Sequence, residues 1–103
     1  KGSFLSGESD LLNRQETDKL SDQELIARTL AGEKRAFEII VRRYQKLVYN
    51  LVYQMLQNHE AAADLTQDTF LKAFKHLSSF RSNASFKPWL LKIASNSTLN
   101  YIR

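Results

Sequence analysis

Chain-breaking residues are scarce in this sequence, and that scarcity constrains the fold more than any other feature. The 103 residues include three Gly and one Pro. A β-sandwich or barrel needs a turn roughly every 8–12 residues, and such turns rely heavily on Gly and Pro. Apolar residues instead recur at three- and four-residue steps, which is the helical period. The sequence therefore predicts an all-α fold, a compact bundle of about four helices.

Helix boundaries are marked by capping residues. Ser21 and Glu24 are spaced as a capping box, and Gly32 suits the position just after a helix. Asn58 and Ser85 are placed to cap two later helices, the second of which tolerates Pro88 in its first turn because no hydrogen bond is lost there. The expected helices span residues 21–31, 33–57, 59–78 and 85–103.

The apolar stripes of the first two helices define the expected core. In the first helix the stripe is Leu25, Ile26 and Leu30. In the second helix the expected stripe comprises Phe37, Ile40, Tyr44, either Leu47 or Val48, Leu51 and Met55.

The two ends of the chain differ in character. Residues 1–20 are polar and mixed in charge, without a sustained apolar period, so we expect a flexible N-terminal tail followed by one domain over residues 21–103. The last expected helix is still running at Arg103, and the chain does not begin with Met. We therefore expect a shortened or excised chain.

Composition argues against several classes of protein. There is no Cys, which excludes disulfides and thiolate metal sites. No stretch of 18 apolar residues and no secretory signal pattern is present, so we expect a cytoplasmic protein without membrane insertion. No Gly-rich phosphate loop or metal-binding His pair occurs, and His59 and His76 are expected at the surface. We expect no catalytic residue, no cofactor and no metal.

Charge is unevenly distributed along the chain. Residues 69–103 carry six Lys or Arg and no acidic residue, giving a local charge of +6. Residues 1–68 carry nine basic and eleven acidic residues, giving −2. A basic segment without acids is typical of a protein that binds a polyanion, although a solvated charged face has the same pattern.

The third expected helix has two apolar stripes, although a helix in a small bundle needs only one for its core. The second stripe is therefore a candidate docking surface, unless Phe70 or Phe74 packs in the core. The first stripe comprises Leu65, Thr69, Ala73 and Leu77, and the second comprises Ala63, Gln67, Phe70 and Phe74.

Three segments, taken in order, carry a resemblance to a known family. They are residues 36–44 (AFEIIVRRY), 64–74 (DLTQDTFLKAF) and 80–96 (FRSNASFKPWLLKIASN). Together they resemble region 2 of bacterial sigma factors of the extracytoplasmic-function type, over about residues 20–103. The resemblance implies the region 2 fold and a role in transcription initiation rather than catalysis.

The resemblance assigns two sets of site residues. The helix with the second segment is expected to dock on the β′ clamp helices of core RNA polymerase, and the loop and helix of the third segment to recognise and melt the promoter −10 element by capturing non-template bases. The polymerase-binding set is Ala63, Asp64, Gln67, Asp68, Phe70, Leu71 and Phe74. The DNA-binding set is Lys72, His76, Phe80, Arg81, Ser82, Asn83, Ser85, Lys92, Asn96, Asn100 and Arg103.

The chemistry of the second set suits a melted strand. Basic residues can follow the phosphates, and Asn can read a base edge because it carries both a donor and an acceptor. Phe80 can line a base pocket or pack in the core, whereas Phe86 and Trp89 are expected in the core.

The resemblance also implies limits and partners. A complete member has a second domain that reads the −35 element, and no such sequence is present here. An anti-sigma factor is an expected partner. Two alternatives remain: a helical protein-interaction module of the anti-sigma or adaptor type, and a helix-turn-helix reader of duplex DNA.

Overall fold

The computed structural model describes residues 19–81 and 83–103, and this part of the chain contains helices and no strand. The expected all-α bundle is therefore confirmed, whereas the expected N-terminal tail lies almost wholly outside the described residues. The elements are α2 (Asp22–Leu30), α3 (Lys34–Leu56), α4 (His59–Lys75), the 3-10 helix η1 (Leu77–Ser79) and α5 (Phe86–Ile102).

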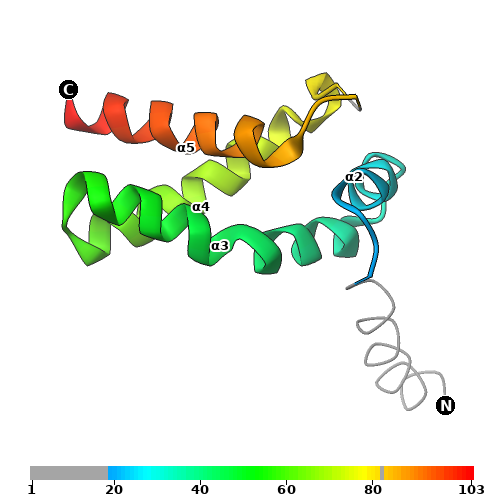
Figure 1. Cartoon of the computed structure of the whole chain (residues 1–103), viewed down its shortest axis with the longest axis horizontal. Coiled ribbons are helices and arrows are strands. Elements are labelled where there is room, and N and C mark those ends of the chain that lie inside the picture. The colour runs from blue at the N-terminus through cyan, green and yellow to red at the C-terminus, as the bar shows by residue number, and fades with distance from the viewer. Residues whose placement is uncertain (1–18, 82) are drawn as a thin grey trace, which may run out of the picture.

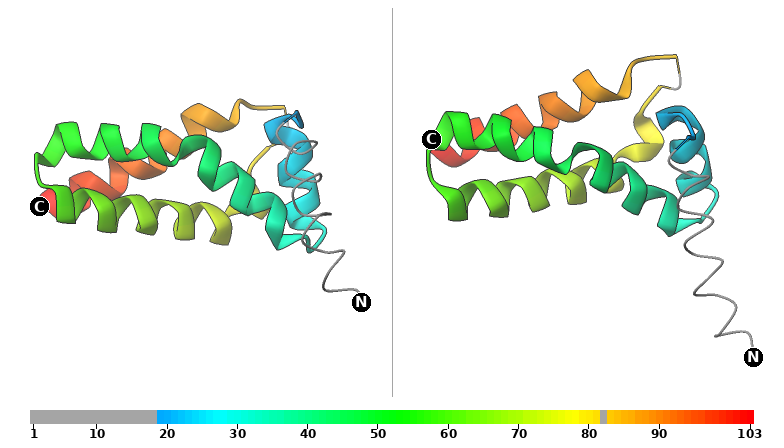
Figure 2. Two further views of the ribbon diagram at one scale, coloured as in Figure 1. Left: turned by 90° about the horizontal axis from the view of Figure 1, so that it is seen from below. Right: turned by 60° about the horizontal axis from the view of Figure 1, so that its bottom comes forward.

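The long helix α3 organises the bundle, because it packs against α2, α4 and α5, and α4 also packs against α5. In Figure 1 and in both views of Figure 2, α2 crosses the end of the bundle at which α3 and α5 begin. The turn between α3 and α4 lies at the opposite end, beside the C-terminal end of α5. The loop before α5 therefore lies at the same end as α2.

The helix caps follow local sequence signals. Ser21 Oγ accepts a hydrogen bond from Glu24 N at 3.1 Å, and Glu24 Oε1 accepts one from Ser21 N at 3.0 Å, so the capping box is present. Gly32 has φ +108°, a conformation that favours glycine. Asn58 Oδ1 accepts from Ala61 N at 2.9 Å. Ser85 is at the N-cap of α5, but its side chain makes no capping bond, so that expectation is wrong.

The core combines residues of every helix. The largest fully buried hydrophobic side chains are Leu25, Ile40, Val48, Val52, Leu77 and Leu90.

Some apolar residues of the expected stripes lie outside this core, Met55 of α3 among them. Leu30 is exposed, whereas its neighbour Thr29 is buried and donates from Oγ1 to Leu25 O at 2.8 Å. Of Leu47 and Val48, the structure buries Val48. The third helix also ends three residues early, at Lys75, because the chain tightens into η1 and buries Leu77.

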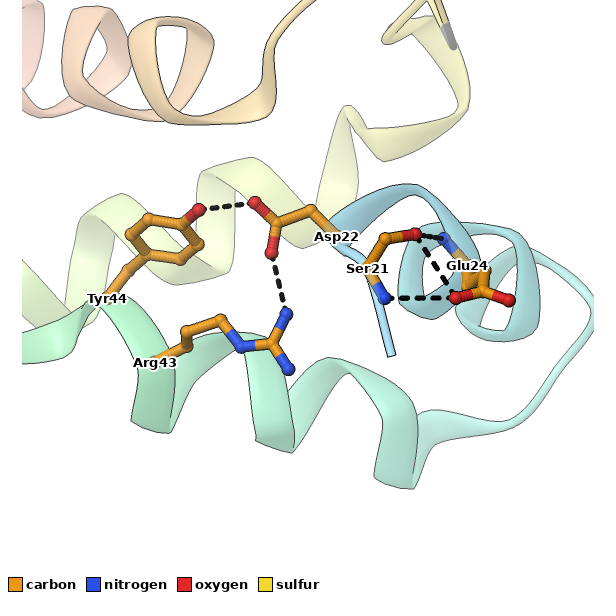
Figure 3. Close-up of polar contacts among 5 residues, drawn as sticks. All are labelled: Ser21, Asp22, Glu24, Arg43 and Tyr44. Atoms are coloured by element: carbon orange, nitrogen blue, oxygen red, sulfur yellow. Dashed lines mark hydrogen bonds and ion pairs between the residues drawn. The ribbon is translucent and has the colours of Figure 1, made fainter. Parts of the chain in front are cut away.

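A polar cluster fastens α2 to α3, as Figure 3 shows. Arg43 Nη1 donates to Asp22 Oδ1 at 2.9 Å, and the Tyr44 hydroxyl donates to Asp22 Oδ2. Burial and the hydrogen bond to the Asp22 carboxylate raise the pKa of Tyr44 to about 12. The Tyr44 ring also contacts Phe86 of α5, with centroids 5.7 Å apart. Asp22 therefore holds the short helix α2 against the end of the bundle.

Candidate protein-docking and nucleic-acid interfaces

Most of the expected polymerase-binding residues of α4 are exposed, as a docking surface requires. Ala63, Asp64 and Gln67 are exposed, and Leu71 is 67% exposed. Phe74 is 43% exposed, and its ring packs edge-on against Phe37 of α3 with centroids 5.2 Å apart. The Phe37 contact holds the Phe74 ring in place while leaving part of it open to a partner.

Phe70 departs from the expected docking stripe, because it is only 6% exposed and belongs to the hydrophobic core. Of the two residues that could have packed in the core instead of docking a partner, Phe70 is buried there and Phe74 is partly exposed. Phe70 nevertheless lines an open groove between α3 and α4, with a volume of about 650 Å³. Ala63, Asp64 and Gln67 line the same groove, so four of the seven expected docking residues share one concave surface.

Lys72 joins α4 to α5. Its Nζ lies 3.1 Å from Asp68 Oδ2 and donates to Ser97 Oγ at 2.9 Å. Asp68 belongs to the expected docking set, whereas Ser97 lies beside Asn96 in the sequence. Lys72, itself in the expected DNA-binding set, therefore links an expected docking residue of α4 to a buried residue of α5.

One face of α5 is polar and exposed. Steps of four, four and three residues place its members within about 80° of one another around the helix. In the described part of the chain, their side chains make no hydrogen bond or ion pair, so their donors and acceptors are available to a ligand. The members of this face are Lys92, Asn96 and Asn100 of α5 together with Arg103 at its C-cap.

Phe80 packs in the core rather than lining an open base pocket. It is 8% exposed, and its ring centroid lies 5.1 Å from that of Trp89 and 5.6 Å from that of Phe86. Of the two interpretations left open for Phe80, the structure supports core packing in the unbound domain, and a role of the ring in base binding stays a prediction. The expected core position of Phe86 is confirmed, whereas Trp89 is only partly buried and packs against the core.

The loop residues that follow Phe80 are at the surface. Arg81, Asn83 and Ser85 are exposed, as is His76 at the end of α4. Ser82 lies outside the described residues.

Sequence reasoning missed two features of α3. His59 is exposed as expected, but its ring stacks on Tyr53 with centroids 4.5 Å apart, and its Nδ1 shares a hydrogen bond with the Tyr49 hydroxyl. The four-residue spacing of Tyr49 and Tyr53 is the signal that could have indicated this stack. The α3 side of the groove was also missed.

Neither a metal site nor a membrane span is found where the structure describes the chain. Across residues 19–81 and 83–103, no three His, Cys, Asp or Glu residues are grouped so as to hold a metal ion. The helices there are too short or too polar to cross a bilayer.

Comparison with known proteins gives a consistent result. The family model described as Sigma-70 region 2 matches residues 40–103. The RNA polymerase sigma-H factor of Pseudomonas aeruginosa is 36% identical over 81 residues, which are 79% of this chain and 42% of that protein. The ECF RNA polymerase sigma-E factor of Escherichia coli strain K12 is 37% identical over 86 residues, 84% of this chain and 44% of that protein. The chain thus spans less than half the length of these relatives.

A solved structure is similar over most of the chain. It is an NMR structure of an engineered region 2 of sigmaE in complex with GTAAAA, with 38% sequence identity and a TM-score of 0.77. The match covers 82% of this chain and 87% of that one.

Proposed function

Starting from the fact that this chain belongs to the sigma-70 region 2 family and is of the extracytoplasmic-function type, we propose that it directs transcription initiation by docking on core RNA polymerase and reading the promoter −10 element. The domain binds bases of the non-template strand and thereby stabilises the opened duplex. No bond is made or broken by the domain, and no cofactor is required. Its place of action is the cytoplasm.

The observation that carries this proposal is the α5 face. Lys92 and Arg103 supply charge for phosphates, while Asn96 and Asn100 between them can read base edges. The similar engineered region 2 of sigmaE was solved with GTAAAA, which supports an oligonucleotide of that kind as the ligand here. Because Phe80 is buried, base recognition falls to the Asn side chains and the exposed loop residues rather than to stacking on that ring.

Docking on polymerase is supported by the exposed stripe of α4. An apolar strip with amide and acidic groups at its edge suits a partner helix pair with basic residues. We propose the β′ clamp helices as that partner, and the contacts as Leu71, Phe74, Gln67 and Asp68 together with the groove residues Ala63 and Asp64. An anti-sigma factor is a further expected partner.

The alternative is a helical protein-interaction module without DNA readout. The stripe on α4 suits that function equally well. The exposed α5 face does not, because it carries basic residues and no acidic residue, which favours a polyanion, and its Asn side chains can read base edges. Binding to single-stranded DNA therefore separates the two functions.

The test is a fluorescence anisotropy titration of the domain with labelled GTAAAA, with the same six bases in shuffled order and with a duplex of the first sequence. We expect the first strand to bind best, and all binding to weaken between about 50 and 200 mM salt as counterions are no longer released favourably. Equal binding of the two strands and the duplex at both salt concentrations would contradict −10 reading.

A further inference from the structure

The groove between α3 and α4 has a second wall that the sequence-derived docking set does not include. The wall is formed by Val41, Gln45, Lys46 and Tyr49 of α3. Positions 41, 45 and 49 recur at four-residue steps and therefore share one side of the helix. The groove is thus a two-helix surface rather than one stripe on α4.

The floor and the rim of the groove differ in polarity. Phe70 is buried and Val41 is partly buried, so the floor is apolar. Gln45, Lys46 and Gln67 are exposed around it. An apolar centre with a polar rim is the arrangement found in protein–protein interfaces.

Opposite charges stand on opposite walls. Lys46 lies on the α3 wall and Asp64 on the α4 wall, and neither forms an ion pair with any residue that the structure describes. A partner segment that places a carboxylate beside Lys46 and a cation beside Asp64 is attracted by both charges. The same segment in the reversed orientation is repelled by both. The two charges therefore fix which way round a partner segment lies in the groove.

The size and lining of the groove favour a protein segment over a small molecule. Its volume of about 650 Å³ lies in the range of ligand pockets, roughly 300–1,000 Å³. Small-molecule sites, however, hold their ligand with a few converging polar groups in a mostly enclosed apolar cavity. Here the polar groups are exposed side chains at the rim, which a helix presenting one apolar side chain and flanking charges can cover.

We propose that the α3 wall is the second half of the polymerase-docking surface, and that Lys46 is a specificity-determining residue that pairs with a carboxylate of the polymerase helix. That helix inserts an apolar side chain over Val41 and Phe70 and directs a basic residue to Asp64. This inference rests on the proposed function, because the opposite wall of the groove belongs to the proposed docking set and the two walls form one continuous surface.

The test measures the affinity of the fluorescently labelled domain for purified core RNA polymerase. Lys46→Glu is compared with Lys34→Glu, which makes the same charge change at an exposed position of α3 outside the groove. We expect Lys46→Glu to weaken binding by about tenfold or more, and Lys34→Glu to change it by less than about twofold. The difference should shrink at high salt, because the pair lies at the solvent-exposed rim.

The orientation of the occupant gives a second readout. A double variant, Lys46→Glu with Asp64→Lys, keeps the net charge but exchanges the two signs across the groove. We expect it to bind no better than Lys46→Glu alone, since the polymerase helix cannot turn round without losing its other contacts. Far-UV circular dichroism and the thermal midpoint of each variant verify that the domain is folded.

The outcomes distinguish a failure of this inference from a failure of the proposed docking on polymerase. If the unmodified domain binds core polymerase and Lys46→Glu weakens binding no more than Lys34→Glu, the inference is wrong and the proposed function stands. If the exchanged double variant binds as well as the unmodified domain, net charge rather than orientation matters, and the inference is again overturned. If the unmodified domain does not bind core polymerase, the docking function itself fails.

Discussion

Lys72 of α4 donates from Nζ to Ser97 Oγ of α5 at 2.9 Å, while the same Nζ lies 3.1 Å from Asp68 Oδ2. Ser97 is buried, whereas the Lys72 and Asp68 side chains are each nearly half exposed. The hydrogen bond between Lys72 and Ser97 is therefore shielded from solvent on the Ser97 side, whereas the ion pair between Lys72 and Asp68 is exposed to solvent. Lys72 therefore links α4 to α5 as well as carrying charge.

Replacing Lys72 tests this contact. We expect Lys72→Met, which keeps the apolar stem, to lower the free energy of unfolding by about 1 kcal/mol, the usual contribution of one such hydrogen bond. Ser97→Ala should cost a similar amount alone and almost nothing when added to Lys72→Met, because both changes remove the same bond. Urea unfolding of the four proteins measures the cycle. Additive losses would show that the two side chains do not interact in solution.

Asn96 is expected to carry base readout on α5. Asn96→Ala should lower the preference for GTAAAA over the shuffled strand by about 1–3 kcal/mol, the usual discrimination of one bidentate base contact. Asn50→Ala removes an exposed Asn from α3 and is the matched control, for which no change is expected. Anisotropy titrations of both strands provide the measurement. A loss of affinity that is equal for both strands would indicate that Asn96 does not read sequence.

Lys92 is expected to contact phosphate rather than a base. Lys92→Gln should weaken all strands alike and reduce the magnitude of the slope of log K against log salt by about 0.7, the contribution of one phosphate contact to a single strand. Titrations at four salt concentrations give the slope. Lys34→Gln, on α3, is the control and should leave the slope unchanged. An unchanged slope in Lys92→Gln would remove this residue from the proposed interface.

The caps and the helical period could be predicted from sequence because they are local. Ser21 and Asn58 each bond a backbone N–H three residues away, so a short segment contains the whole interaction. The long apolar period of α3 similarly predicts one long helix whatever its neighbours are. The family could also be predicted, from the resemblance of three segments. That resemblance depends on the order and spacing of residues and not on how the helices pack.

Burial on a particular face could not be predicted, because it depends on where neighbouring helices lie. Phe70 and Phe74 are one turn apart on α4, yet Phe70 is buried whereas Phe74 stays 43% exposed even though its ring contacts Phe37 of α3. Leu30 is exposed because α2 buries Thr29 instead. The groove needs both α3 and α4, so a pattern on either helix alone contains only half of it.

The Tyr44 phenol should make stability depend on pH in alkaline solution. Its pKa is raised from 10.0 to about 12 in the folded domain, mainly by burial and then by the bond to Asp22. The raised pKa means that the folded state favours the neutral phenol, so the stabilisation is complete below pH 10 and is lost as the pH rises from 10 to about 12. Tyr44→Phe has no phenol to titrate. The difference in unfolding free energy between the two proteins, measured by urea unfolding at several pH values, should shrink over that interval, and a constant difference would show that the pKa of Tyr44 is not raised in the folded domain.

Phe80 distinguishes a core residue from a base-stacking residue, because the two roles affect different measurements. Its ring is 8% exposed and touches both Phe86 and Trp89, so Phe80→Ala should lower the free energy of unfolding by about 3 kcal/mol. Phe80→Leu keeps most of the volume and should cost less than about 1.5 kcal/mol. Under conditions where both variants remain folded, Phe80→Leu should bind GTAAAA with nearly unchanged affinity, because no stacking surface is lost. If Phe80→Leu instead keeps its stability but no longer binds GTAAAA, the Phe80 ring must leave the core to contact a base. The packing of Phe80 against Phe86 and Trp89 would then describe only the unbound domain.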